Sequence, residues 1–120
     1  MTPQRLDQRA AEALPLAPRV YHVLLALGGS TLHGYAIMRS FQELTGGAEQ
    51  LLPGTLYATL ARMVETGLIE ETQAPAGDDE RRRCYRVTPF GRAVAVAESE
   101  RLRALLEVAA VQRLVGEGAR

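Results

Sequence analysis

The sequence predicts a winged helix-turn-helix fold that is mainly α-helical, with a small β-hairpin and a long C-terminal helix. Three observations lead to this prediction. Three segments between Pro18 and Gly67 show the 3.6-residue apolar repeat of amphipathic helices. Two short strand-like segments then flank a turn rich in proline, glycine and acidic residues. A last helical segment opens at Pro89 and runs to about Val115, and elements in this order make up the winged helix-turn-helix motif.

Length and composition favour one compact globular domain. The chain has 120 residues, 47% of them hydrophobic, which suffices for one core. It contains no apolar run near the ~20 residues that a membrane-spanning helix needs, and its charged N-terminus is unlike a secretory signal. Cys84 is the only cysteine, so neither an internal disulfide nor a cysteine-based metal cluster is expected. We therefore expect a cytoplasmic protein with no membrane partner, in which Cys84 has a packing role.

The charges balance, so net charge alone gives no argument for nucleic-acid binding. Fourteen basic and fourteen acidic residues cancel, and residues 33–88 carry six arginines against eight acidic residues. Every basic residue is arginine, which suits bidentate contacts with phosphates and bases, although a biased genome composition would give the same pattern. Binding to nucleic acid therefore depends on where individual arginines lie.

Residues 1–17 form an N-terminal arm that is either a short helix or a disordered tail. Its weak apolar repeat is ended by two prolines, at positions 15 and 18. From Pro18 the pattern strengthens, and apolar residues at i, i+3, i+4 and i+7 predict the first helix of the domain, which ends at Gly28 and Gly29. These apolar residues are Val20, Val23, Leu24 and Leu27.

A second helix is expected between a cap at Ser30 or Thr31 and a glycine stop at Gly46 and Gly47. Its expected buried positions are Tyr35, Ile37, Met38, Phe41 and Leu44. Arg39 falls on the exposed side of this helix, where it can contact a phosphate.

The third helix begins near Pro53, whose missing N–H costs nothing in a first turn, and stops at Gly67. Its apolar face consists of Leu56, Leu60, Met63 and Val64. The opposite face carries Thr55, Ala58, Arg62 and Glu65, with Thr59 at the margin. In a winged helix-turn-helix protein the third helix enters the major groove, so this face is the predicted DNA-contact surface. The free N–H groups around Gly54 and Thr55 can hold a phosphate.

A β-hairpin follows, with strands at 68–72 and 82–88 and a turn at 75–80. Arg81, Arg82 and Arg83 adjoin its tip, where they can reach the DNA backbone or the minor groove. The acidic residues 78–80 offer a competing surface ion pair to the same side chains.

The last helix carries more apolar residues than one domain can bury. One stripe consists of Leu102, Leu105, Leu106 and Ala109, and another of Ala104, Val108, Val111 and Val115. A second apolar face implies a partner surface. We expect a homodimer interface that includes Leu102, Leu105, Leu106, Val108 and Ala109; the alternative is a helix folded back against its own arm. The expected units are the arm (1–17), the winged-helix domain (18–88) and a dimerisation helix (89–120).

Four blocks of residues carry a resemblance to a known family: His33-Gly34-Tyr35-Ala36-Ile37, Pro53-Gly54-Thr55-Leu56-Tyr57, Gly67-Leu68-Ile69 and the nine residues from Arg83 to Gly91. In this order and spacing they resemble the PadR family of transcriptional regulators, in particular its compact subgroup with a single helix after the wing. The resemblance implies a homodimer that represses a promoter carrying an inverted repeat, with release by a small-molecule effector. Cys84 stands where the family commonly has an aromatic residue. The chain has no tryptophan, so the binding of flat aromatic ligands between tryptophans does not carry over.

The expected DNA-binding residues combine these surfaces: Arg39, Gly54, Thr55, Tyr57, Ala58, Thr59, Arg62, Arg81, Arg82 and Arg83. No metal site is expected, because His22 and His33 have no second ligand at metal-binding spacing, and no cofactor is expected. The chain lacks a glycine-rich phosphate loop and a nucleophile elbow, so it is not expected to be an enzyme.

The first hypothesis for the function is therefore a sequence-specific DNA-binding repressor. Two alternatives stand beside it. One is a winged-helix protein–protein interaction module, which the acidic balance of residues 33–88 favours. The other is a small-molecule sensor with little affinity for DNA.

Overall fold

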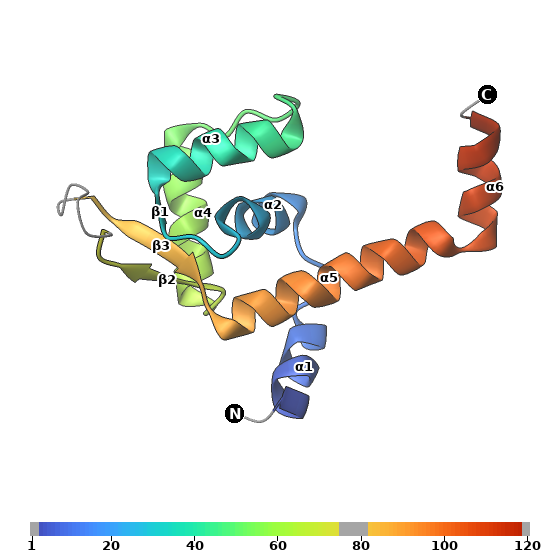
Figure 1. The fold of residues 1–120 in the computed structure, drawn as a ribbon, viewed down its shortest axis with the longest axis horizontal. Helices are drawn as coiled ribbons and strands as arrows, with labels where there is room; N and C mark the ends of the chain where they lie inside the picture. Colours follow the sequence, from blue (N-terminus) through green and yellow to red (C-terminus); the bar gives the residue numbers. More distant parts are fainter. Residues whose placement is uncertain (1–2, 75–81, 119–120) are drawn as a thin grey trace.

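The fold is a winged helix-turn-helix domain with one helix before it and two after it (Figure 1). The computed structural model describes residues 3–74 and 82–118. Its elements are, in chain order, α1 (Pro3–Glu12), α2 (Pro18–Leu27), β1 (Leu32–His33), α3 (Gly34–Thr45), α4 (Pro53–Glu65), β2 (Ile69–Thr72), β3 (Cys84–Val87), α5 (Pro89–Glu107) and α6 (Ala109–Gly118). Helices α2, α3 and α4 and the β2–β3 hairpin follow the predicted order, and the N-terminal arm is helical.

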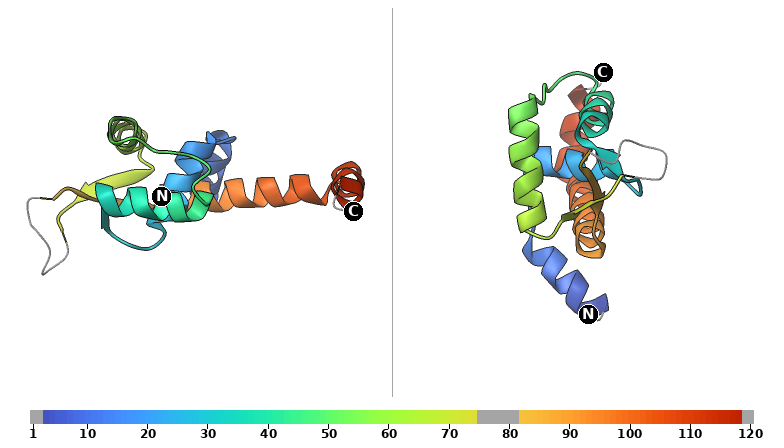
Figure 2. Two further views of the ribbon diagram at one scale, coloured as in Figure 1. Left: turned by 90° about the horizontal axis from the view of Figure 1, so that it is seen from above. Right: turned by 90° about the vertical axis from the view of Figure 1, so that its left-hand side faces the viewer.

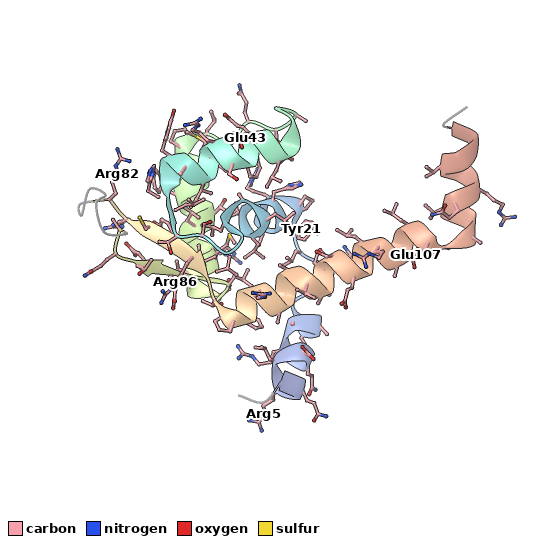
Figure 3. The ribbon with its side chains drawn as sticks, viewed as in Figure 1. Arg5, Tyr21, Glu43, Arg82, Arg86 and Glu107 are labelled. Atoms are coloured by element: carbon pink, nitrogen blue, oxygen red, sulfur yellow. The ribbon has the colours of Figure 1, made fainter. Side chains whose placement is uncertain are left out.

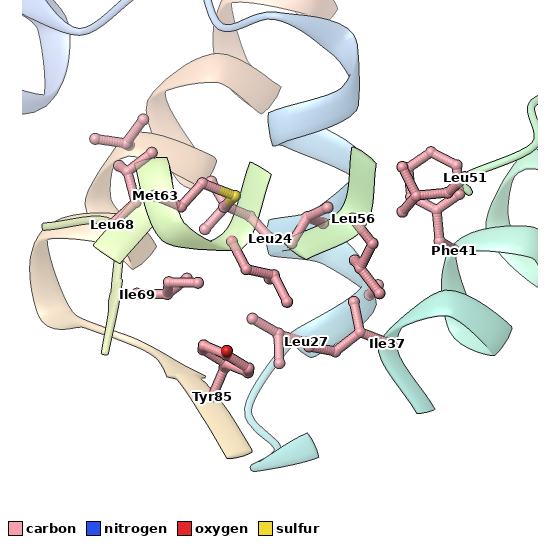
Figure 4. Close-up of a cluster of buried hydrophobic side chains, with 14 of the residues drawn as sticks. Leu24, Leu27, Ile37, Phe41, Leu51, Leu56, Met63, Leu68, Ile69 and Tyr85 are labelled. Atoms are coloured by element: carbon pink, nitrogen blue, oxygen red, sulfur yellow. The ribbon is translucent and has the colours of Figure 1, made fainter. Parts of the chain in front are cut away.

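The core fills the space between α2, α3, α4 and the sheet (Figure 4). Each of these helices contributes one apolar face, and the largest side chains buried there include Leu27, Ile37, Phe41, Leu56, Leu60 and Met63. Burying one such side chain contributes roughly 1.5–3 kcal/mol. Because only its inner face packs into this core, α4 keeps its other side for contacts outside the domain.

The start of α3 differs from the prediction. Ser30 and Thr31 do not cap this helix, because the chain first forms the short strand β1 and α3 begins after it. The cap is His33, whose Nδ1 lies 3.3 Å from the backbone nitrogen of Ala36. At the other end, Gly46 has a positive φ of 61° and closes α3 as predicted.

Helix α3 buries fewer side chains than predicted. Ile37 and Phe41 are buried and Met38 is half-buried, but Tyr35 and Leu44 are exposed. Tyr35 lies two residues, or about 200°, around the helix from Ile37, and therefore on the opposite side. Leu44 occupies the last turn, where an exposed loop begins.

The sheet has three strands in the order β1-β3-β2, one more than the predicted hairpin. The central strand β3 pairs antiparallel with both neighbours, with Cys84 opposite Thr72 on one side and His33 on the other. Successive side chains of a strand point to opposite faces of the sheet, yet Cys84 and Tyr85 are both buried, so β3 is covered on both faces at this point. This confirms the packing role expected for Cys84.

The start of α5 is bonded to the turn between α4 and β2. The Thr88 hydroxyl donates to the Gly67 carbonyl (2.5 Å) and accepts from the Gly91 N–H (2.9 Å), so one side chain caps α5 and joins it to the turn. Gly91 is packed so closely that a Cβ there would lie 1.9 Å from the Leu68 carbonyl oxygen. The wing and α5 are therefore held in a fixed position relative to α4.

Helix α5 crosses α1 and α2 and then projects out of the domain (Figures 1 and 2). At the crossing, the Leu16 N–H donates to the Glu98 carboxylate (2.7 Å), and the Tyr21 and Ser99 hydroxyls lie 2.7 Å apart. Arg101, one turn further along, pairs with Glu98. We call these five residues the α5 junction.

The C-terminal segment is two helices, not the single helix predicted to reach about Val115. Helix α5 ends at Glu107, Val108 has an extended backbone (φ −63°, ψ 130°), and α6 follows. Residues 103–110 are all exposed, so packing within this chain does not hold the helix straight. The break contains neither glycine nor proline, which is why the sequence pattern did not indicate it.

We predict that Gly91→Ala destabilises the fold. The added Cβ would collide with the backbone carbonyl of Leu68, which cannot move without shifting the turn that holds α5. Overpacking of this kind costs about 3 kcal/mol, which chemical denaturation will measure. The matched control is Gly116→Ala, where an added Cβ meets nothing within 4 Å. Equal stability of the two variants would contradict the packing described for Gly91.

We also predict that the stabilisation by Glu98 is lost in acid. The hydrogen bond from Arg101 lowers the pKa of Glu98 despite its burial, and the Leu16 N–H adds to the effect. Stabilisation by a group with a lowered folded-state pKa is complete above its ordinary value of 4.5 and disappears as the pH falls through the lowered value. The unfolding free energy of the wild type should exceed that of Glu98→Gln near neutral pH, and the two should converge as the pH falls well below 4.5. A difference that does not change with pH would contradict this assignment.

Candidate nucleic-acid interface

Helix α4 lies at the edge of the domain with one face turned outward (Figure 2). The predicted positions Gly54, Ala58, Arg62 and Glu65 are exposed on this face. Val64, predicted to belong to the apolar face, is instead 37% exposed. It lies about 80° around the helix from Leu56, at the margin of the buried side.

Thr55 and Thr59 lie at one edge of the outer face and are half-buried. The Thr59 hydroxyl donates to the Thr55 carbonyl at 2.8 Å. A hydroxyl has a single proton to donate, so Thr59 in this rotamer can accept from a donor on a base edge but cannot donate to a phosphate.

Arg62 extends this edge toward the start of α2. It lines a groove together with Thr59 and Arg19, a first-turn residue of α2. Neither arginine forms an ion pair with any residue that the structure describes. Two unpaired guanidinium groups on one groove favour an anionic neighbour. Arg19 is not among the predicted DNA-binding residues, because only the fold brings it beside Arg62.

The start of α4 has no side-chain cap. Leu52 occupies the N-cap position and Pro53 has no N–H, so the N–H groups of Gly54 and Thr55 lack a side-chain acceptor. A helix N-terminus of this kind carries a partial positive charge and binds phosphate readily.

A second polar cluster lies where the wing meets the start of α3. His33, Tyr35, Tyr57, Arg82 and Arg83 line a pocket of about 460 Å³ there, and we call these five residues the wing cluster. The His33 and Tyr35 rings stack with their centroids 6.5 Å apart. The Arg82 guanidinium lies 3.0 Å from His33 Nε2, and Figure 3 shows Arg82 beside the start of α3.

The two contacts of the His33 ring compete with each other. A neutral imidazole has one N–H and one accepting nitrogen, yet the Ala36 N–H and the Arg82 guanidinium are both donors. When Nδ1 accepts from Ala36, Nε2 carries the proton and cannot accept from Arg82. His33 therefore holds Arg82 weakly, and Arg82 keeps its donors for an anion.

Tyr57 reaches the wing cluster because Gly34 leaves room for it. A Cβ on Gly34 would lie 2.7 Å from the Tyr57 hydroxyl oxygen. About half of the Tyr57 side chain is exposed, so its hydroxyl lies at the surface between α3 and α4. His33 and Tyr35 were not in the predicted contact set. Both belong, with Gly34, to a block of the family resemblance, and both stand at the start of a predicted helix.

The wing arginines differ in their partners. Arg83 pairs with Glu71 at 3.3 Å, whereas Arg82 has no carboxylate partner within the described ranges. An exposed ion pair is worth about 1 kcal/mol or less, so Arg83 can exchange Glu71 for a phosphate at small cost. Arg81 lies outside the described residues. The same holds for the acidic residues 78–80, which were expected to pair with the wing arginines.

Arg39 is exposed on α3, one turn after Tyr35 and therefore on the same face of the helix. It has no ion-pair partner among the residues described. A phosphate beside the wing cluster can therefore also be reached from this face of α3.

The second half of α5 and α6 expose apolar side chains. Of the residues predicted to form a dimer interface, Leu105, Leu106, Val108 and Ala109 are exposed and Leu102 is half-buried. Leu114 and Val115 of α6 continue the exposed apolar surface. Helix α1 lies against the first half of α5 (Figure 1), so the arm does not cover these side chains.

The described part of the chain offers neither a metal-binding cluster nor a membrane-spanning helix. No group of three or more His, Cys, Asp or Glu side chains there is placed to hold a metal ion. No helix there is both long enough and apolar enough to cross a lipid bilayer.

Comparisons with known proteins agree with this geometry. Residues 23–97 match a family model described as the transcriptional regulator PadR-like family. The transcriptional regulator Rv3488 of Mycobacterium tuberculosis is 39% identical over 102 residues, which cover 85% of this chain and 82% of that protein.

Solved structures share the fold. RosR of H. salinarum is similar with a TM-score of 0.66 and 27% identity, over 89% of this chain and 96% of that one. Bacillus subtilis PadR, crystallised in complex with operator DNA, is similar with a TM-score of 0.57 and 23% identity, over 73% of this chain and 48% of that one. At this lower identity the likeness shows the fold alone.

We predict that Gly34→Ala moves Tyr57 without unfolding the domain. The added Cβ meets only the far end of the Tyr57 side chain, which can rotate away. The unfolding free energy should therefore change by less than about 1 kcal/mol. The aromatic NMR signals of Tyr57 should shift, while those of Tyr21, which lies in the α5 junction, stay in place. Unchanged Tyr57 signals would show that the two residues are not in contact.

Proposed function

The chain belongs to the PadR-like family of transcriptional regulators, and we propose that it represses transcription by binding promoter DNA as a homodimer on an inverted repeat. The observation that carries this proposal is the exposed outer face of α4. Arg19 and Arg62 lie along one edge of this face, and the wing cluster lies beyond the other.

Each surface has a distinct role in this arrangement. The outer face of α4 enters the major groove, where the small side chain of Ala58 allows close approach and Arg62 contacts a guanine edge or a phosphate. The uncapped N–H groups of Gly54 and Thr55 bind the sugar–phosphate backbone. The wing arginines bind the neighbouring backbone or minor groove.

The placement of these groups accounts for DNA binding by a chain with no net charge. Arg19 and Arg62 lack carboxylate partners among the described residues, as does Arg82. Phosphate contacts depend on such local cations, because each one releases counterions from DNA. The acidic groups Glu70 and Glu71 are paired with arginines of β3 and its approach, which reduces their repulsion of DNA.

Dimerisation adds a second copy of the DNA-contact surface. Burial of the exposed apolar side chains of α5 and α6 against a second copy would remove them from water. The two α4 helices would then meet successive major grooves about 34 Å apart. In this proposal residues 18–88 bind DNA, residues 89–120 hold the dimer and residues 1–17 support the start of α5. We also infer a cytoplasmic location, in keeping with a single buried, free cysteine.

We predict that Arg62→Ala and Arg82→Ala weaken DNA binding in different ways. Duplexes selected by the wild type from a random pool are titrated by fluorescence anisotropy at several salt concentrations. Arg82→Ala should weaken binding to all sequences and lower the slope of log Kd against log salt by about 0.9. Arg62→Ala should cost about 1–3 kcal/mol and relax specificity at one base pair.

The matched control for these variants is Arg92→Ala, which removes an exposed arginine from α5. It should bind DNA like the wild type. Binding that is insensitive to salt and to both test substitutions would contradict the proposed interface.

We predict that the double substitution Leu105→Glu, Leu106→Glu gives a folded monomer. Two carboxylates in the apolar contact would have to be desolvated on dimerisation, which is strongly unfavourable. Sedimentation should show a dimer for the wild type and for Leu44→Glu, a control at an exposed leucine of α3. A wild type that sediments as a monomer at DNA-binding concentrations would contradict the dimer.

A further inference from the structure

A buried carboxylate lies where α5 leaves the winged-helix domain. Glu98 is 2% exposed and is the one charged side chain buried within the described residues. It belongs to the α5 junction, and neither the DNA-contact surface nor the exposed apolar residues of α5 and α6 include it. A buried charge is costly to retain unless its bonds serve a purpose.

The bonds of Glu98 are directional. One carboxylate oxygen accepts from the Leu16 N–H at 2.7 Å, and the other accepts from Arg101. Leu16 lies in the short linker between α1 and α2, so this contact joins α5 to the segment that leads into the DNA-binding domain. Both oxygens are engaged, and the carboxylate therefore cannot rotate without losing a bond.

The next residue of α5 makes a second bond to the domain. The Ser99 hydroxyl donates to the Ala95 carbonyl at 2.8 Å within α5. Its proton is thereby used, so the Tyr21 hydroxyl of α2 donates to the Ser99 oxygen. Glu98 and Ser99, two successive residues of α5, are thus bonded to the α1–α2 linker and to α2, respectively. These two bonds oppose both rotation and sliding of α5.

An apolar side chain at this position would fill the same space without this restriction. Apolar contacts are not directional, and buried polar groups are known to select one arrangement at a cost in stability. The lowered pKa of Glu98 agrees with a carboxylate that stays ionised at this place. The junction is therefore suited to setting the direction of α5.

We propose that the α5 junction, centred on Glu98, sets the separation of the two α4 helices in the dimer and thereby the half-site spacing that the protein accepts. Glu98 is a positioning residue and touches no DNA. The inference rests on the proposed dimeric function. A helix of 19 residues spans about 28 Å, so a tilt of about 15° moves its far end by about 7 Å. This displacement equals the axial rise of about two base pairs of DNA.

The test compares half-site spacing in three chains. Duplexes selected by the wild type are remade with one to four base pairs inserted or removed between the half-sites. The variant is Glu98→Leu, which puts an apolar side chain of similar size in place of the carboxylate and removes both bonds. The control is Glu100→Gln, at an exposed residue on the same helix. We expect a preference of about tenfold or more for one spacing in the wild type and the control, and less than about threefold in Glu98→Leu.

A second measurement needs no DNA. The substitution Ala58→Cys places one spin label on each α4 helix of the dimer, and electron–electron resonance measures the distance between the two labels. The native cysteine, Cys84, is buried away from the labelling reagent. The distance distribution should be narrow in the wild type and broad in Glu98→Leu. If Glu98→Leu does not fold, Tyr21→Phe removes the neighbouring bond alone and should broaden the distribution to a smaller extent.

The outcomes are distinct. A folded, dimeric Glu98→Leu that keeps the wild-type spacing preference and the narrow distribution would overturn the inference and leave the proposed function intact. A wild type that is monomeric or binds no selected duplex would overturn the proposed function, and the inference with it. Loss of stability in Glu98→Leu with unchanged spacing would assign the α5 junction a purely structural role.

Discussion

Burial of the inner face of α4 determines how the other surfaces of the domain are arranged. Leu56, Leu60 and Met63 are almost fully enclosed, and their packing decides which side chains of the helix face outward. A rotation of α4 by one residue, about 100°, would expose part of this apolar face and turn polar side chains toward the core. The proposed DNA-contact surface is thus specified mainly by the apolar residues behind it. The tight contact between Gly91 and the Leu68 carbonyl then places α5 relative to the same helix.

Charge acts locally in this molecule. The chain is neutral as a whole, but Arg19 and Arg62 line one groove beside α4, and Arg82 lies in the wing cluster at the start of α3. Acidic side chains of β2 are paired with arginines across the sheet. Because phosphate binding responds to the cations within a Debye length, about 8–10 Å, this distribution matters more than the total. The alternative of a protein–protein interaction module rests on the acidic balance of residues 33–88, and that balance does not describe where the individual charges lie.

The elements with a long apolar repeat could be predicted from the sequence, and those determined by distant partners could not. Helices α2 and α4 and the outer face of α4 follow from periodicity and from glycine or proline at their ends. The strand β1 has two residues, too few to show a period, and it exists because β3 pairs with it. The cap at His33 and the exposure of Tyr35 follow from that strand. The proximity of Arg19 to Arg62 and the bond from Leu16 to Glu98 depend on tertiary packing, which spacing along the chain does not reveal.

The proposed repressor places the two α4 helices of one dimer in successive major grooves. Methylation protection of guanine N7, which lies in the major groove, reports this arrangement on a selected duplex. We expect two protected patches centred about 10–10.5 base pairs apart, on one side of the DNA, with both patches lost together in a monomeric variant. A single protected patch, or saturating binding that leaves guanine N7 unprotected throughout, would contradict it.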